Sequence, residues 1–283
     1  MVNNPNVLQV PAAELGQGSG VRCEVLPDAA ALTRHFAAAL VTEVRETLAR
    51  GRAHVVFIVP VGPVGQFEMF AQRCNEERLS LARLVLINMD EYLTAEGVWI
   101  PLTDPLSFRA HMQRAFWSRL DPALAPPEQH RHFPDPQDPA ATSRLIEHCG
   151  GVDVAFGGVG ITGHLAFNDP PEPGETIDDE AFARLPTRVV TLNRETRTIN
   201  AVTATRGAID RIPPTAVTVG MKEILEARKI RLYMNRPWQS GIVRKWLHGP
   251  IGVAVPASLV RKHPDVRLTM TAEVTELPEP TLR

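Results

Sequence analysis

The chain is poor in cysteine and has little excess of charge, and each shortage argues against a class of protein. Of its 283 residues, only Cys23, Cys74 and Cys149 are cysteines, and no Cys-x-x-Cys pair occurs. An odd, scattered set predicts buried reduced thiols and a cytoplasmic protein rather than a disulfide framework. The formal net charge is −2 and the pI about 6.5, which argues against nucleic acid or a membrane surface as the main partner.

Long apolar runs and several well-known catalytic signatures are absent as well. No apolar segment approaches the ~20 residues of a membrane span, and the first twenty residues do not resemble a signal peptide. The nine histidines show no metal-ligand spacing, so no metal is expected. There is no Gly-x-Ser-x-Gly elbow, no nucleophilic cysteine context and no Gly-Lys-Ser/Thr phosphate loop, so covalent catalysis and P-loop binding are unsupported.

Apolar runs of strand length alternate with amphipathic helices along the chain. A helix is expected over 28–50, with Asp28 as N-cap and Gly51 beyond its end. Strands are expected over 54–59, 84–87, 152–156, 188–192, 216–219, 230–234 and 266–270. Further helices are expected over 66–75, 104–120, 140–148, 221–227 and 238–248. Because the strands are apolar throughout, we predict an α/β fold: a Rossmann-like three-layer sandwich with a mostly parallel central sheet.

The length fits one large domain or two small ones, and no low-complexity linker divides the chain. Residues 1–20 are rich in Asn, Gly, Pro and Gln, which predicts a flexible N-terminal arm. We therefore expect a single domain over 21–283. Ligands of such sheets bind outside the carboxyl ends of the strands, where the loops 60–66, 88–93 and 157–169 are expected.

Two adjacent acids, Asp90 and Glu91, directly follow an apolar strand. Neighbouring side chains of an extended segment point to opposite sides, so one can face a pocket while the other faces the scaffold. A partly desolvated carboxylate at such a strand end can shuttle protons. The plain alternatives are a solvated loop or a carboxylate that caps the next helix.

The segment 157–163 holds four glycines, and His164 and Asp169 follow it. Glycines let the backbone approach a ligand and expose amide N–H groups, although a tight turn without a ligand would look the same. A histidine there can act as a general acid and base supported by a carboxylate, or it can be structural.

These stretches together resemble the glucosamine-6-phosphate deaminase family. The resemblance rests on Asn88-Met89-Asp90-Glu91-Tyr92 and on the run from Gly157 to Pro170, which contains Gly163-His164-Leu165-Ala166-Phe167-Asn168-Asp169-Pro170. Later matches are Val217–Met221, Val255–Leu259 and His263-Pro264. The related sugar-phosphate lactonases share the glycine-rich stretch with its histidine. They lack the Ala-Phe-Asn-Asp/Glu-Pro and Met-Asp-Glu-Tyr motifs.

The resemblance implies a reaction in which an amino sugar opens its ring, a proton moves from C2 to C1 and ammonia leaves. It implies catalytic roles for Asp90 as proton shuttle, His164 in ring opening and Asp169 as the support of His164. Substrate-binding roles are expected for Gly62, Glu91, Gly158, Gly160, Thr162 and Ala166. No cofactor is implied. The implied partner is a small amino sugar or sugar phosphate, and family members often form homo-oligomers.

The chain departs from the family pattern at the catalytic and phosphate sites. Thr162 stands where the family has Asp, and Asp169 stands where it has Glu. Restoring an acid with Thr162→Asp is expected to speed ring opening if His164 acts there. In the phosphate loop 60–65, valines replace two hydroxyl residues, while Val202 and Gln239 align with a family Arg and Lys. Losing these contacts is expected to weaken binding of a dianionic phosphate.

Three functional hypotheses follow. The chain can be an amino-sugar deaminase with altered phosphate recognition, acting on a sugar that is unphosphorylated or carries an apolar or neutral group at C6. It can be an ordinary glucosamine-6-phosphate deaminase with relocated contacts, for which Arg197, Arg206 and Arg236 are candidates. It can also be a catalytically inactive sugar-binding or regulatory homologue.

Overall fold

The computed structural model describes residues 5–279, and its centre is a sheet of seven parallel strands. In spatial order the strands are β1 (Arg22–Leu26), β10 (Val266–Thr271), β9 (Lys229–Met234), β6 (Val154–Gly157), β2 (Val55–Val59), β3 (Leu84–Asn88) and β5 (Arg131–His132). The predicted parallel α/β architecture is confirmed.

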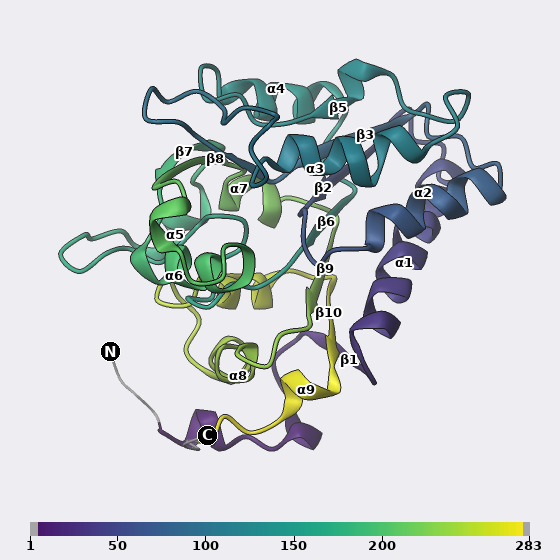
Figure 1. Cartoon of the computed structure of the whole chain (residues 1–283). Helices are drawn as coiled ribbons and strands as arrows, with labels where there is room; N and C mark the ends of the chain where they lie inside the picture. The colour runs from purple at the N-terminus through teal and green to yellow at the C-terminus, as the bar shows by residue number, and fades with distance from the viewer. Residues whose placement is uncertain (1–4, 280–283) are drawn as a thin grey trace.

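Helices cover both faces of this sheet (Figure 1). The helices of the described residues are α1 (Ala29–Ala49), α2 (Gln66–Glu76), α3 (Phe108–Ala115), α4 (Ala140–His148), α5 (Asp179–Ala183), α6 (Arg194–Ala204), α7 (Met221–Leu225), α8 (Gln239–His248) and α9 (Ala272–Thr275). Alternate residues of β2 pack on opposite sides: Phe57 joins a core with α1, α2 and α3, whereas Ile58 joins a core with α4, α7 and α8. A strand buried on both faces must be apolar at every position, which explains its continuous run.

The helix α1 follows the expected sequence signals closely. The Asp28 carboxylate caps it by accepting the Ala31 N–H at 2.7 Å, and Gly51 follows its end with a φ of +77°. Phe36 and Leu40 on its apolar face are fully buried. The helix expected over 104–120 is shorter than predicted, because Asp104 forms a local turn with the Leu106 N–H and Ser107 caps α3 instead.

A second, three-stranded antiparallel sheet was missed by the sequence analysis. It consists of β4 (Asp90–Tyr92), β8 (Thr215–Thr218) and β7 (Arg188–Thr191) in that order. With α6 it encloses a small satellite core around Tyr92 and Phe167. The strand β4 is too short to show a period, but it holds Asp90 directly beyond the end of β3.

Residues 10–20 are folded onto the domain rather than extended as an arm. Leu15 and Ser19 are buried, and the fully buried Arg244 of α8 donates from Nε to the Val10 carbonyl at 2.8 Å. Residues 1–4, the first part of the predicted arm, lie outside the described residues. Cys23, Cys74 and Cys149 are unpaired. Within 5–279, no helix is long and apolar enough to cross a membrane.

Candidate active site

A cleft of about 340 Å³ opens where the carboxyl ends of β9, β6, β2 and β3 meet. All three loops expected from the sequence contribute to it: Pro60–Pro63 after β2, Met89 and Asp90 after β3, and Gly158–Gly160 with His164 after β6. Asp90 and His164 thus face one cavity although they are 74 positions apart in the chain. Parallel strands bring such segments together because their carboxyl ends share one edge of the sheet.

The carboxyl of Asp90 is held in an environment that disfavours its charge. The residue is the first of β4, where its backbone pairs with Thr218, and it is half-buried. Burial and the neighbouring charge of Glu91 raise the pKa of Asp90 to about 8. A carboxyl with such a pKa can both accept and donate a proton near neutral pH, which suits a proton shuttle.

Glu91 does not line the cleft, contrary to the prediction. Its side chain is fully buried on the opposite side of β4, where it accepts hydrogen bonds from Ser107 Oγ, the N–H groups of Tyr92 and Phe108, and both N–H and Nε–H of Arg109. The carboxylate thereby anchors the N-terminus of α3, where negative charge is favourable. The two acids therefore differ: Glu91 caps the next helix, and Asp90 lines the pocket.

The imidazole of His164 is oriented by a buried carboxylate. His164 Nδ1 lies 2.8 Å from Asp169 Oδ1, and the two side chains are 11% and 5% exposed. Burial favours the neutral form of Asp169, but the hydrogen bond and charge of His164 and the hydroxyls of Thr196 and Thr162 outweigh it, so the pKa of Asp169 is lowered. The shorter aspartate therefore reaches His164, and Asp169 supports His164 from outside the cleft.

Gly160 is required by the position of the His164 ring. A Cβ at Gly160 would lie 2.0 Å from His164 Nε2 and Cε1, so a side chain and the imidazole cannot occupy the same space. Gly62, Gly158 and Ala166 also line the cleft, as expected for substrate-binding residues. Ala166 has a φ of +52°, a conformation that is uncommon for non-glycine residues. Thr162 does not line the cleft and instead contacts Asp169.

Two further segments, beyond the three expected loops, line the cleft. The loop after β9 contributes Arg236 and Trp238, and α6 contributes Asn200, whose Nδ2 donates to Tyr92 Oη at 3.0 Å. Polar residues directly after the apolar run 230–234 were the available signal for the first segment. For α6 the signal was the alignment of Val202 with a family Arg, although the low apolar content of this segment did not predict a buried helix.

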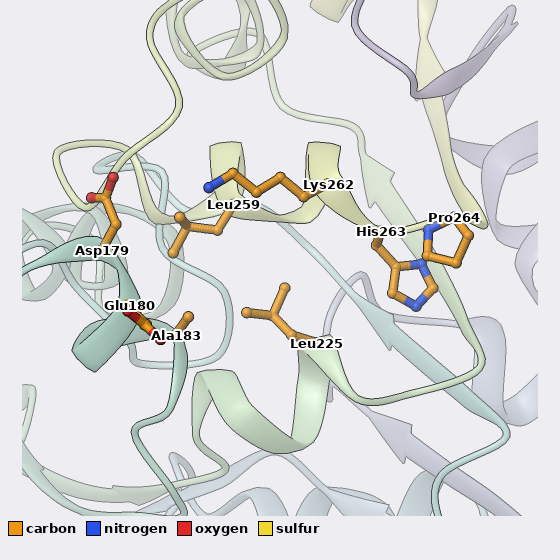
Figure 2. Close-up of a pocket in the computed structure, with 8 residues that line it drawn as sticks. All are labelled: Asp179, Glu180, Ala183, Leu225, Leu259, Lys262, His263 and Pro264. Atoms are coloured by element: carbon orange, nitrogen blue, oxygen red, sulfur yellow. The ribbon is translucent and has the colours of Figure 1, made fainter.

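A second cavity, of about 510 Å³, lies between α5, α7 and the short helix Pro256–Lys262 (Figure 2). In Figure 2 the side chain of Lys262 extends across it above Leu225. Two of its polar groups hold neighbouring backbone: Asp179 Oδ1 accepts the Val253 N–H at 2.8 Å, and His263 Nδ1 accepts the Asp265 N–H at 3.1 Å. The cleft with Asp90 and His164 is therefore the candidate active site. Within the described residues no group of three or more His, Cys, Asp or Glu could hold a metal ion.

Comparison with known proteins identifies the family. The chain is 30% identical over 210 residues to the glucosamine-6-phosphate deaminase of Lachnoclostridium phytofermentans, covering 72% of this chain and 80% of the relative. With the enzyme of the same name from Rhodopirellula baltica it shares 28% identity over 260 residues, 91% of this chain and 96% of the relative. The chain belongs to the glucosamine-6-phosphate deaminase family. No protein-family model matches the chain.

Solved structures of this deaminase family and of the lactonases share the fold. A monomeric glucosamine-6-phosphate deaminase of the NagB superfamily superposes with a TM-score of 0.73 at 26% identity, covering 91% of this chain and all of that one. The 6-phosphogluconolactonase of Thermotoga maritima gives a TM-score of 0.60 at 16% identity, covering 89% of this chain and 99% of the other, which shows the fold alone. The resemblance found in the sequence motifs is thereby confirmed.

The anchoring role of Glu91 predicts a large loss of stability in Glu91→Ala. The change leaves the half-buried Arg109 charge and several N–H groups at the start of α3 without their acceptor. We expect the free energy of unfolding, measured by denaturant titration, to fall by about 3–5 kcal/mol. Glu96→Ala, at an exposed position in the next turn, should change it by less than about 0.5 kcal/mol. Equal effects of the two changes would refute the anchor.

Gly160→Ala should displace the imidazole while leaving the fold intact. The added methyl overlaps the His164 ring, so we expect the imidazole NMR signals of His164 to shift and its contact with Asp169 to weaken. Gly241→Ala in α8 is the matched control, because its Cβ would meet only Pro278 at 4.0 Å. Unchanged His164 signals in Gly160→Ala would show that the ring does not depend on the missing side chain.

Proposed function

We propose that this protein converts a 2-amino-2-deoxy aldose into a ketose with release of ammonia. The observation that carries the proposal is that a poorly hydrated carboxyl, Asp90, and an oriented imidazole, His164, line one cleft at the ends of neighbouring strands. Membership of the glucosamine-6-phosphate deaminase family supports the same chemistry.

His164 is suited to open the sugar ring. Its Nδ1–H donates to Asp169, which leaves Nε2 to take the proton of the sugar O1 and return it to the ring oxygen. The bond between C1 and the ring oxygen breaks, and C1 becomes an aldehyde. The aldehyde then acidifies the neighbouring hydrogen on C2.

Asp90 is suited to move that hydrogen. Its carboxylate takes the proton from C2 and delivers it to C1, while a proton passes from nitrogen to O1, so the aldehyde becomes an alcohol and C2 becomes an imine carbon. Water then adds to C2 and ammonia leaves. Overall, one amino sugar and one water give one ketose and one ammonia, and these steps call for no cofactor.

The lining of the cleft favours a substituent other than a phosphate dianion. Val61 and Pro63 supply apolar surface there, and among the described residues that line the cleft Arg236 is the only Arg or Lys. Gln239 is engaged, since its Nε2 donates to the Val159 carbonyl and its Oε1 accepts the Arg236 N–H. A buried dianion needs several charge-assisted hydrogen bonds, whereas one guanidinium matches a neutral or singly charged group.

Ammonia release from a small panel of sugars tests the proposal. We expect turnover of glucosamine, or of an amino sugar with a singly charged C6 group, with a kcat/KM at least about tenfold above that for glucosamine 6-phosphate, the change that 1.4 kcal/mol produces. Turnover of the 6-phosphate alone, lost in Arg236→Ala, would instead assign an ordinary deaminase with relocated contacts. Binding of these sugars without any ammonia would reject the proposed reaction.

Asp90→Asn tests two effects of Asp90, its role in catalysis and its effect on the free energy of unfolding. We expect kcat to fall at least about 10²-fold, because the amide cannot shuttle a proton. A carboxyl whose pKa is higher in the folded than in the unfolded chain loses stability as pH rises from about 4 to 8. At about 1.4 kcal/mol for each pKa unit, the variant should therefore be more stable than the native chain by roughly 5 kcal/mol at pH 8.

The same stability difference should disappear at pH 3, where the carboxyl is protonated in both the folded and the unfolded chain. Unfolding titrations at the two pH values provide the internal control. Unchanged ammonia release by Asp90→Asn would remove the residue from the mechanism.

A further inference from the structure

We propose that Thr162 and Thr196 are positioning residues, two neutral hydroxyls that fix which nitrogen of His164 carries the proton. Thr196 lies on α6 and is fully buried, while Thr162 lies in the loop after β6. The consequence for turnover rests on the proposed function, whereas the effect on the imidazole does not.

One oxygen atom of Asp169 is the centre of this arrangement. Asp169 Oδ1 lies 2.7 Å from Thr162 Oγ1, 2.7 Å from Thr196 Oγ1 and 2.8 Å from His164 Nδ1. An ionised carboxylate only accepts hydrogen bonds, so each of these three atoms must supply a hydrogen. Both hydroxyls are thereby committed as donors to Asp169, and His164 must carry a proton on Nδ1.

The hydroxyl oxygens reinforce that choice of tautomer. Thr162 Oγ1 and Thr196 Oγ1 lie 2.8 Å and 3.2 Å from His164 Nδ1. With their hydrogens turned to Asp169, their lone pairs are left toward the Nδ1–H group. A proton on Nε2 instead would place the bare Nδ1 against three oxygen atoms. His164 Nε2 therefore remains free to exchange protons in the cleft.

The distances also explain why a threonine fits at position 162. A carboxylate there would approach the Asp169 oxygen within hydrogen-bond distance, and two such groups cannot both remain ionised. One would retain its proton, and the charge beside His164 would no longer be fixed. The structure thus reverses the expectation from the family pattern: Thr162→Asp should slow the enzyme.

Thr196 connects the His164–Asp169 pair to the side of α6 that lines the cleft. Asn200, Thr203 and Ala204, which line the cleft, follow Thr196 by four, seven and eight positions and so share its helix face. A sugar that contacts these residues and the carboxylate that orients His164 are therefore held by the same helix.

The imidazole ¹⁵N signals of His164 in the substrate-free protein provide the direct test, with His164→Gln for assignment. We expect the neutral ring to carry its proton on Nδ1 in the native chain and in Thr196→Ser. In Thr196→Val, which removes one donor from Asp169, a mixture of tautomers is expected. Thr198→Val is the control, since Thr198 is exposed on the same helix and its hydroxyl bonds only to Arg194. A single, unchanged Nδ1–H signal in Thr196→Val would overturn the proposal.

Kinetics supply the second readout. In Thr196→Val the Asp169 carboxylate loses one hydrogen-bond donor, so the pKa of Asp169 should rise and kcat should begin to fall at a higher pH on the acid side. At neutral pH kcat should fall about tenfold, while KM should change little. Other titratable groups near Asp169 are Glu172 and Glu175 of the following loop and Arg188 of β7, which are the same in every variant. No shift of this acid-side fall in kcat, or no rescue by Thr196→Ser, would contradict the role. Altered ¹⁵N signals without ammonia from any sugar would reject only the proposed function.

Discussion

The site depends on the burial of the Asp90 carboxyl, which raises the pKa of this group. An isolated acid in such a position would adopt its neutral form and lose its use as a base. Asp90 can still act as a base, because it borders an open cleft and its pKa lies near neutrality. The protein therefore retains a destabilising group where its chemistry requires one, as functional sites commonly do.

The scaffold around Asp90 is rigid for reasons that lie outside the cleft. The strand β4 is held between Thr218 of the small sheet and the start of α3, which the buried Glu91 anchors. Two adjacent carboxyls thus have opposite tasks, and the alternation of side chains along a strand separates them. His164 also has two sides: the ring lines the cleft, while its Nδ1 contacts Asp169, Thr162 and Thr196.

The sequence predicted the parts of the molecule that repeat a simple physical pattern. Continuous apolar runs identified five of the seven parallel strands but not β1 and β5, and the loops after β2, β3 and β6 were correctly expected to form the cleft. It could not reveal β4, since three residues show no period, nor α6, whose helix faces a small satellite core. Glu91 was placed at the cleft because sequence alone does not show which of two adjacent acids points inward.

The departures from the family pattern could be seen in the sequence, but their meaning needed coordinates. Thr162 suggested a lost charge beside His164. The distances instead show that the Thr162 hydroxyl donates a hydrogen bond to the shorter Asp169. A second hydroxyl, that of Thr196, donates to the same oxygen from α6. Similarly, Gln239 is not merely a missing cation, since its amide holds the loops of Val159 and Arg236 together.

Direct titration of Asp90 tests the central claim most simply. Infrared difference spectra between the native chain and Asp90→Asn, recorded across pH, report the carboxyl stretch of this one residue. The account predicts a protonated carboxyl that persists at pH 7 and is lost with a midpoint near 8. A midpoint near 4, the value of a solvated aspartate, would contradict it.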